Sequence, residues 1–422
     1  MQQKPFFLAG LPAGLLANLL ICLLAVSPAF GQVLPDGPGK QTVTTACVAC
    51  HALTRVTGAG HSRADWDSVV HMMVNAGAQV PPDQVPVVID YLAKNFPPKT
   101  LPSAAILSGN VHVTIKEWDV PTAGSRPHDP MVAPDGSAWY TGQMANVLGR
   151  FDPKTQQFQE YPLKTPGSGP HGLIADHDGN VWFTANFKAY IGKLNPKTGA
   201  VTEYPMPDPA VRDPHTLILA PNGYIYFTAQ NANRIGRLNP KTGEVKLVSS
   251  PTPRSKPYGM AVDSLGVPYF VAFGSNKVGR IDPDSLAIRE FVLPHADSRP
   301  RRIAITHDDI VWYSDYSRGY LGRLDPKTGQ VTEWASPGGP KSQPYGITAL
   351  GDAVWYSESN TSPNTVVRFD TKTHKFQTWT IPSGGGVVRN IDRTPDGNLW
   401  LACSGVNKIA LVEITPATAA SR

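Results

Sequence analysis

The sequence predicts an α + β multidomain chain in which a small all-α domain precedes an all-β seven-bladed propeller. Three observations predict this fold. An aromatic pair recurs every 43 to 45 residues through most of the chain. Each period has room for four short strands separated by turn residues, as in a propeller blade. The short segment before the repeats instead shows apolar residues at helical spacing over residues 63–76.

The composition agrees with a fold made of many short strands and turns. The chain has 38 glycines and 41 prolines, which favour turns between short strands. Its net charge of +5 is small for 422 residues, and no dense block of lysine and arginine is present. We therefore expect no nucleic-acid partner, because such partners are usually met by a concentrated basic patch.

The first 31 residues are expected to be a secretory signal peptide. Lys4 precedes an apolar run over residues 6–26, and Ala29-Phe30-Gly31 offers small residues to a signal peptidase. Cleavage would leave a periplasmic protein that begins at Gln32. The alternative is an uncleaved membrane anchor, since the apolar run is almost long enough to span a bilayer. Only in that case would the membrane be a partner.

A Cys-x-x-Cys-His motif follows, formed by Cys47, Cys50 and His51. Two thiols at this spacing can add to the two vinyl groups of a haem, and the adjacent histidine then lies beneath the iron. We therefore predict one covalent haem c in a domain over residues 32–97, with His51 as the proximal ligand. The remaining cysteines are Cys22 in the signal and Cys403, which we expect to be a small buried apolar residue.

The sixth iron ligand should come from the predicted helix over residues 63–76. Met73 lies on the same face as Trp66 and Val70, one turn further along. The segment from Trp66 to Ala78, together with residues 88–94, resembles small class I cytochromes c. This resemblance also implies that Met73 is the sixth ligand. The other candidates are Met72, His61 and His71, and Met73 can alternatively be an ordinary core residue.

Residues 98–108 are read as a stiff linker, residues 109–416 as the propeller and residues 417–422 as a tail. The last repeat lacks its outer strand, and residues 113–118 are a spare copy of that strand. Pairing the two would close a ring of seven blades and remove an exposed edge. The aromatic pairs are expected to form the core between blades. They are Trp139-Tyr140, Trp182-Phe183, Tyr226-Phe227, Tyr269-Phe270, Trp312-Tyr313, Trp355-Tyr356 and Trp400-Leu401.

The repeat units resemble the streptogramin (virginiamycin B) lyase family, whose blades carry Pro-His-Gly-Ile, Trp-Phe-Thr and Ile-Gly-Arg segments. In that family a magnesium-dependent elimination opens a cyclic depsipeptide lactone. Two histidines of consecutive Pro-His motifs take part, together with a glutamate just before the second motif. The resemblance therefore implies His171, Asp213 and His215 as catalytic residues, with aspartate replacing glutamate. The chain departs from the family in its last two blades, where Tyr345 and Arg389 stand at the histidine positions.

Equivalent positions of successive blades face one central funnel, so His128 should join His171 and His215 there. Converging imidazoles with a carboxylate can move protons or hold Mg²⁺ or another divalent metal. The opposite wall can bind a polar or anionic small molecule. Its candidate binding residues are Tyr258, Arg301 or Arg302, Tyr345 and Arg389, with Asp315 and Glu358 after the aromatic pairs. A Pro-His start also suits the first turn of a blade, where the histidines would only form structural hydrogen bonds.

Three functions fit this pattern. In the first, the chain is an exported monohaem c-type cytochrome that passes single electrons to a periplasmic redox partner and binds an unknown ligand in the propeller. In the second, the propeller is a metal-dependent lyase that eliminates across a C–O bond, with the haem domain as an accessory. In the third, it is a protein-interaction scaffold. The first is favoured because a lyase needs no electron carrier, although a propeller can host all three.

Overall fold

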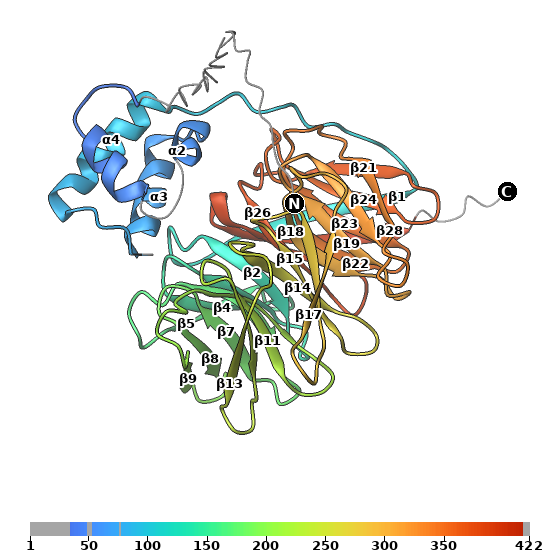
Figure 1. The fold of residues 1–422 in the computed structure, drawn as a ribbon. Coiled ribbons are helices and arrows are strands. Elements are labelled where there is room, and N and C mark those ends of the chain that lie inside the picture. Colours follow the sequence, from blue (N-terminus) through green and yellow to red (C-terminus); the bar gives the residue numbers. More distant parts are fainter. Residues whose placement is uncertain (1–33, 49–52, 76, 417–422) are drawn as a thin grey trace, which may run out of the picture.

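The computed structural model describes residues 34–48, 53–75 and 77–416. The predicted signal peptide, Cys50, His51 and the tail lie outside these residues. The N-terminal unit is helical and packs its elements around one small core (Figure 1). Its elements are α1 (Lys40–Thr42), the π-helical turn η1 (Val43–Cys47), α2 (Thr54–Gly58), α3 (Arg63–Asn75), the 3-10 turn η2 (Pro82–Gln84) and α4 (Val85–Asn95).

The predicted helix over residues 63–76 is confirmed as α3. Its Trp66 and Val70 are buried against Leu92 of α4, and the indole N–H of Trp66 donates to the Phe96 carbonyl oxygen at 2.9 Å. Met73 lies one turn beyond Val70 and is only partly buried. Val69 and Val74 of α3 pack against this core, whereas Met73 is not part of it, so the role of Met73 as a ligand stays a prediction.

The remainder of the described chain forms seven four-stranded antiparallel sheets arranged around one axis (Figure 1). Blade one contains β2 (Pro127–Val132), β3 (Ala138–Gly142), β4 (Val147–Asp152) and β5 (Gln157–Pro162). Blade two contains β6 (Pro170–Ala175), β7 (Val181–Ala185), β8 (Tyr190–Leu194) and β9 (Val201–Pro205). Blade three contains β10 (Pro214–Leu219), β11 (Ile225–Ala229), β12 (Arg234–Leu238) and β13 (Val245–Ser249). Blade four contains β14 (Pro257–Val262), β15 (Pro268–Ala272), β16 (Lys277–Ile281) and β17 (Ile288–Val292).

The last three blades follow the same order, from the axis outwards. Blade five contains β18 (Pro300–Ile305), β19 (Val311–Asp315), β20 (Tyr320–Leu324) and β21 (Val331–Ala335). Blade six contains β22 (Pro344–Leu350), β23 (Ala353–Glu358), β24 (Thr365–Asp370) and β25 (Phe376–Thr380). Blade seven contains β26 (Val388–Arg393), β27 (Leu399–Cys403), β28 (Lys408–Pro416) and β1 (Val111–Asp119), with the short 3-10 turn η3 (Ser404–Val406) after β27. The prediction of seven blades is therefore confirmed.

Ring closure occurs as the sequence predicts. Strand β1 pairs antiparallel with β28 over nine residue pairs, from Val111 opposite Pro416 to Asp119 opposite Lys408. The first and last parts of the propeller thus share one blade. Because no strand edge is left open at the seam, this pairing also protects the propeller from edge-to-edge association.

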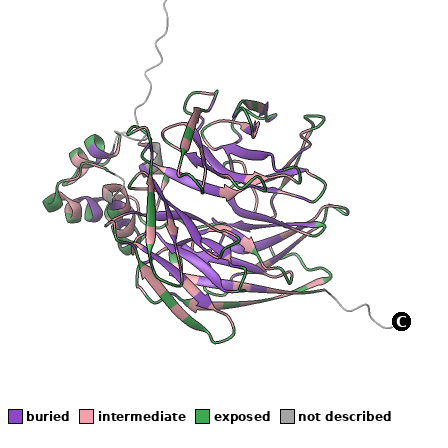
Figure 2. Cartoon of the chain, turned by 90° about the horizontal axis from the view of Figure 1, so that it is seen from below, coloured by how far each residue is buried: buried purple, intermediate pink, exposed green. Residues whose placement is uncertain are grey.

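The aromatic pairs form the core, as predicted, and a glycine in the third strand of blades one to five explains how they fit there. Phe227 of β11 is fully buried and its ring lies on Gly236 of β12. A Cβ atom at Gly236 would lie 2.0 Å from Cζ of that ring. Figure 2 shows buried residues filling the strands of the blades, with exposed residues in the turns and outer strands. Cys403 is fully buried too, and burial raises the pKa of its thiol.

The connection between the two units is attached to blade six. Ser103 bridges Ser362, and the Thr378 backbone N–H donates to the Leu107 carbonyl oxygen at 3.0 Å. The helical unit lies beside the propeller on the side of β2 and β26 (Figure 1). Among the described residues, no helix is long and apolar enough to span a membrane.

Candidate functional site

An irregularity in the innermost strand of every blade builds the axial site. The register of each inner strand shifts after its first residue, as between Pro127 and Pro130 in β2. Such a bulge leaves two successive residues unpaired, so that both can face the axis instead of alternating between the two faces of the sheet. Across the seven blades these residues form two layers at the axis. The first layer is His128, His171, His215, Tyr258, Arg301, Tyr345 and Arg389, and the second is Asp129, Gly172, Thr216, Gly259, Arg302, Gly346 and Asn390.

Hydroxyl groups of the second strands hold these layers in place. The Thr184 hydroxyl accepts the Gly172 backbone N–H at 2.8 Å and donates to the His215 carbonyl oxygen of the next blade at 2.6 Å. Thr141, Thr228 and Ser314 make the equivalent pair of bonds. The Trp-Phe-Thr segment therefore positions the axial residue of the neighbouring blade as well as its own.

Three imidazoles form a continuous row in the first layer. The ring centroids of His128 and His171 are 3.7 Å apart, and those of His171 and His215 are also 3.7 Å apart. The three residues are only 3–4% exposed. Burial, together with nearby positive charges, lowers the pKa of each well below its ordinary value. The row is therefore neutral at pH 7, and each ring keeps one nitrogen lone pair.

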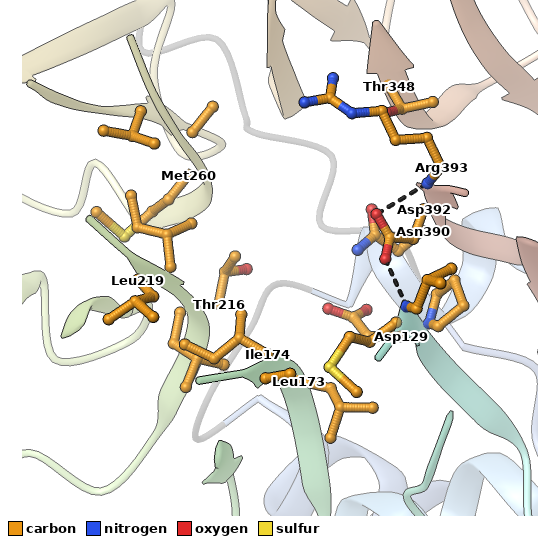
Figure 3. Close-up of a pocket in the computed structure, with 18 of the residues that line it drawn as sticks. Asp129, Leu173, Ile174, Thr216, Leu219, Met260, Thr348, Asn390, Asp392 and Arg393 are labelled. Carbon is orange, nitrogen blue, oxygen red and sulfur yellow. Dashed lines mark hydrogen bonds between the residues drawn. The ribbon is translucent and has the colours of Figure 1, made fainter. Parts of the chain in front are cut away.

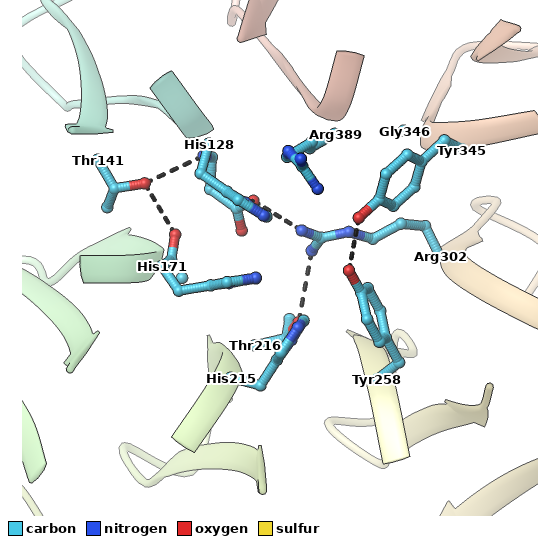
Figure 4. A network of polar contacts seen from close by, with 12 residues as sticks. His128, Thr141, His171, His215, Thr216, Tyr258, Arg302, Tyr345, Gly346 and Arg389 are labelled. Carbon is cyan, nitrogen blue, oxygen red and sulfur yellow. Dashed lines mark hydrogen bonds and ion pairs between the residues drawn. The ribbon is translucent and has the colours of Figure 1, made fainter. Parts of the chain in front are cut away.

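The opposite wall of the first layer is made of tyrosines and arginines. The hydroxyls of Tyr258 and Tyr345 are 2.5 Å apart. The guanidinium of Arg301 lies over the ring of Tyr345 at 3.9 Å. Arg389 donates from Nε to the Ser404 hydroxyl at 2.9 Å. Figure 4 shows the histidine row, the tyrosine pair and Arg389 surrounding the axis.

The second layer joins the two walls through one buried ion pair. Arg302 of blade five donates from Nη2 to a carboxylate oxygen of Asp129 in blade one at 2.6 Å, and both side chains are buried. The same carboxylate oxygen lies 2.9 Å from His128 Nδ1. Arg302 also reaches the Thr216 hydroxyl at 3.4 Å. Glycines at three of the seven positions of this layer leave the axis room for this arginine.

Two predicted site residues serve other contacts. Asp213 accepts the backbone N–H groups of Asn231 and Ala232, so its carboxylate stabilises a turn of blade three. Burial raises its pKa to about 6. The carboxylate beside the imidazoles is that of Asp129 instead. Glu358 is fully buried within blade six, where it accepts from Ser336 and Thr365. The expectation that both residues face the funnel is therefore corrected. Both residues lie outside the bulge, because Asp213 directly precedes β10 and Glu358 ends the second strand β23.

Asp315, also expected near the funnel, is similarly engaged. Its carboxylate accepts the Arg299 backbone N–H at 3.0 Å and pairs with Arg318 at 3.2 Å. Of the two candidates in blade five, both arginines reach the axis, Arg301 in the first layer and Arg302 in the second.

The residues present do not fit a magnesium ion. His128, Asp129 and His171 offer three ligand atoms within 4.8 Å of one another. Mg²⁺ prefers several oxygen ligands, including carboxylates. The one carboxylate here is already bound by Arg302, and the charges of Arg301, Arg302 and Arg389 act on the same imidazoles. A dication would therefore meet cationic groups and few oxygen atoms.

A cavity of about 810 Å³ lies on the other side of the Arg302–Asp129 pair, towards the ends of the inner strands. Figure 3 shows Leu219 and Met260 on one wall and Asn390 and Asp392 on the other. Asp392 accepts the Val132 backbone N–H at 2.8 Å. Arg302 and Asp129 line this cavity, whereas the imidazole row does not. The ion pair therefore separates the cavity from the histidines.

The sequence reasoning missed Asp129 and Thr216. Each directly follows a Pro-His pair, so the motif could have identified both had the strand been recognised as bulged. In a regular strand, successive side chains point to opposite faces, so the residue after a histidine that faces the axis would be expected to face away from the axis.

The chain was compared with known proteins. The family model described as the virginiamycin B lyase family matches residues 103–337. A streptogramin B lyase structure is 27% identical, with a TM-score of 0.66, and the match covers 72% of this chain and 98% of that chain. Virginiamycin B lyase from Staphylococcus aureus is 28% identical, with a TM-score of 0.65 and coverage of 71% and 99%.

A catalytically inactive variant of the S. aureus lyase, solved with quinupristin, matches equally well at 28% identity and a TM-score of 0.65. Hydrazine synthase from Kuenenia stuttgartiensis shares the fold alone, at 16% identity and a TM-score of 0.58 over 71% of this chain and 97% of that chain. A search of curated protein sequences gave no significant match. The family match covers more than half of the 422 residues, and it agrees with the blade architecture described above. The chain belongs to the virginiamycin B lyase family.

Proposed function

We propose that the propeller is a lyase-like enzyme in which a neutral axial imidazole removes a proton from carbon and a C–O bond breaks. The row of His128, His171 and His215 carries this proposal. A general base must be unprotonated and within reach of the proton that it removes. Burial and the neighbouring arginines keep all three imidazoles neutral, which supplies the first condition.

His171 is the preferred base. His128 Nδ1 is 2.9 Å from Asp129, and His215 Nδ1 is 3.1 Å from the Thr216 hydroxyl. His171 Nδ1 is buried and has no hydrogen-bond partner among the described residues. Of the three Nδ1 atoms, that of His171 is therefore the one whose lone pair is not engaged by another protein group. In the elimination, the carbon next to a carbonyl loses its proton to His171, a C=C bond forms, and the ester C–O bond breaks to release a carboxylate.

The arginines complete this chemistry without a metal ion. Negative charge develops on the carbonyl oxygen as the proton leaves and on the carboxylate as the C–O bond breaks. Arg301 and Arg389 lie in the same layer as His171, and the charge of Arg389 acts on that imidazole. Fixed positive charge in this layer would stabilise both developing negative charges. The arginines thus take the place that the resemblance to the family assigned to magnesium.

The test uses quinupristin, together with simple β-acyloxy carbonyl esters, as probes for the wild-type protein. Elimination opens an ester without adding water, so the product of a lactone keeps its mass and gains a conjugated double bond. His171→Ala should lower kcat/KM by roughly 10²–10⁴-fold, the usual contribution of a general base. The matched control is His177→Ala, an exposed histidine on the cavity side, which should retain full activity.

Mass spectrometry and ultraviolet absorbance decide the outcome. Absence of ring opening with every probe, or products that carry one added water, would overturn the elimination. Equal loss in His171→Ala and His177→Ala would also overturn the role of His171.

A second function, one-electron transfer, is favoured by the Cys47, Cys50 and His51 motif. Of these residues, Cys47 is described, and it packs against the core of the helical unit. A haem attached there would add the apolar core that so small a domain needs. Met73 of α3 would supply the sixth ligand, and His/Met ligation would give a high potential suited to a periplasmic redox partner.

Expression with a haem-attachment system in the periplasm tests this second function. The wild type should retain one haem after denaturation, and a Cys47→Ala/Cys50→Ala variant should retain none. Met73→His should lower the potential by on the order of 0.1 V, within the ~0.8 V range that axial ligands span. Free iron-porphyrin after denaturation of the wild type would contradict covalent attachment, and an unchanged potential would exclude Met73.

A further inference from the structure

We infer that the first axial layer binds the carboxylate of a small organic acid through Arg301, Arg389 and Arg126. Arg126 directly precedes β2, and the charge of Arg389 acts on it, so it lies near the first layer. The inference concerns binding alone and stands even if the propeller does not catalyse elimination. The inferred ligand is an anion, whereas the resemblance to the family implied a metal cation at this site.

The first argument is an excess of positive charge. Four guanidinium groups, those of Arg126, Arg301, Arg302 and Arg389, face the carboxylate of Asp129, which pairs with Arg302. The charge of Asp65 in α3 also acts on Arg126, but at a longer distance than an ion pair. No carboxylate of the described residues lies within ion-pair distance of the other three arginines. Buried or half-buried charges are normally paired, because leaving water costs free energy that a partner must offset. The unpaired arginines therefore indicate a ligand of opposite charge.

The second argument is that the first layer contains buried hydrogen-bonding atoms that have no partner. Arg301 Nε and His171 Nδ1 are buried without a partner among the described residues. His171 is 3% exposed. Buried polar atoms without partners are rare in native proteins and call for an explanation such as a bound ligand. A carboxylate can accept a hydrogen bond from Arg301 Nε.

The third argument is that the arginines are held before any ligand arrives. The Arg301 guanidinium carbon lies 3.9 Å from the ring centre of Tyr345 and 4.2 Å from that of Tyr316. It also lies 4.8 Å from that of Phe273 and 5.2 Å from that of Tyr258. These rings fix the cation but do not neutralise it. Among the described residues, Ser404 is the one hydrogen-bond partner of the Arg389 side chain and is bound through Nε, so the terminal nitrogens of Arg389 remain available.

Neighbouring groups respond to the uncompensated charge. Burial raises the pKa of Tyr345, but the positive charges of Arg301, Arg389 and Arg302 outweigh burial, so its pKa lies below the usual value. Burial and the charge of Arg389 also lower the pKa of Arg126. A bound anion would oppose the part of each shift that comes from the positive charges of the arginines.

The shape of the site favours a carboxylate. Guanidinium groups match the planar carboxylate with two parallel hydrogen bonds. The tyrosine and phenylalanine rings around Arg301 suit the carbon skeleton of an organic acid. Arg126, Arg301 and Arg389 are partly exposed, whereas the histidines are buried, so an anion that approaches this end of the axis meets arginines first.

Isothermal titration calorimetry on the full-length protein tests the inference, with sodium acetate, inorganic phosphate and MgCl₂ as separate probes. Acetate should bind saturably with one site. Arg389→Gln and Arg301→Gln should each weaken acetate binding about 10- to 100-fold, the range expected for one charge-assisted bond. Arg289→Gln, an exposed arginine on the outer strand β17, is the matched control and should bind acetate as the wild type does.

Each outcome bears on the inference. No saturable acetate binding, or binding that survives both axial substitutions, would overturn it. Tighter binding of phosphate than of acetate would overturn the carboxylate assignment. Saturable Mg²⁺ binding lost in His171→Ala would restore a metal site. Arg389→Gln is the variant that is least expected to misfold, because Arg389 is half-buried and its side chain makes a single hydrogen bond among the described residues. Acetate binding without turnover of any ester would uphold this inference while overturning the proposed lyase activity.

Discussion

The two walls of the axial site occupy equivalent positions of one repeat, yet they have opposite chemistry. Blades one to three contribute His128, His171 and His215, which are neutral, stacked and almost fully buried. Blades five and seven contribute Arg301 and Arg389, which are charged and partly exposed. The backbone is the same in both walls, because each side chain follows the same bulge. The difference teaches that this fold fixes where a side chain points and leaves its chemistry to the sequence.

The largest expected effect comes from breaking the link between the walls. Arg302→Met leaves Asp129 as a buried charge without its partner, which should destabilise the protein by about 3–5 kcal/mol. Chemical denaturation monitored by tryptophan fluorescence measures this. The double variant Arg302→Met/Asp129→Leu removes both charges and should regain most of the loss. Equal stability of the single and double variants would show that the pair does not hold the walls together.

The hydroxyl bonds between blades should matter next. Thr184→Val keeps the shape but leaves the Gly172 N–H and the His215 carbonyl oxygen unpaired, at a cost of about 1–3 kcal/mol. Ser314→Ala tests the same device on the arginine wall and should cost a similar amount. Thr202→Val on the exposed outer strand β9 is the control and should stay within about 0.5 kcal/mol. A loss on only one wall would break the equivalence of their backbones.

Acid should distinguish the walls by charge. The folded pKa of His171 lies well below its unfolded value of 6.5, so below pH 6.5 the unfolded chain binds the proton that the folded chain does not. Stability therefore falls as pH decreases through 6.5, by up to about 1.4 kcal/mol per pH unit for this group. Between pH 6.5 and 5.5 the unfolded histidine becomes protonated progressively, so His171→Gln should reduce the slope by about 1 kcal/mol per pH unit, as followed by urea denaturation. Arg389→Gln should leave the slope less affected, since arginine does not titrate in this range, and an equal change would argue against neutral imidazoles.

The smallest expected effect concerns the tyrosine pair. Tyr345→Phe removes one member of the Tyr258–Tyr345 hydrogen bond and should cost about 0.5–1.5 kcal/mol. Thermal unfolding measures it, with Tyr320→Phe on the third strand of blade five as the control. A cost as large as that of Arg302→Met would mean that the tyrosines, and not the ion pair, connect the two walls.

The helical unit and the propeller also differ in how far sequence reasoning reaches. Regular spacing was sufficient for the propeller, because seven copies of one pattern predict both the blades and their closure by β1. In the helical unit a single helix period predicted α3 correctly. It could not decide whether Met73 is a ligand or a core residue, since a helical face does not report what lies opposite it.

The sequence by itself determined the number of blades, the closure of the ring, the burial of Cys403 and the convergence of His128, His171 and His215 on one axis. These follow from local periodicity and from symmetry, which need no knowledge of distant contacts. Only the tertiary structure decided that Asp129 rather than Asp213 joins the histidines and that Glu358 stays inside its blade. It likewise decided that Arg302 crosses the axis to a residue 173 positions away. The physical reason is the bulge. One irregular residue changes which side chains face inward, and the pairing of charges across the axis depends on residues that the sequence keeps far apart.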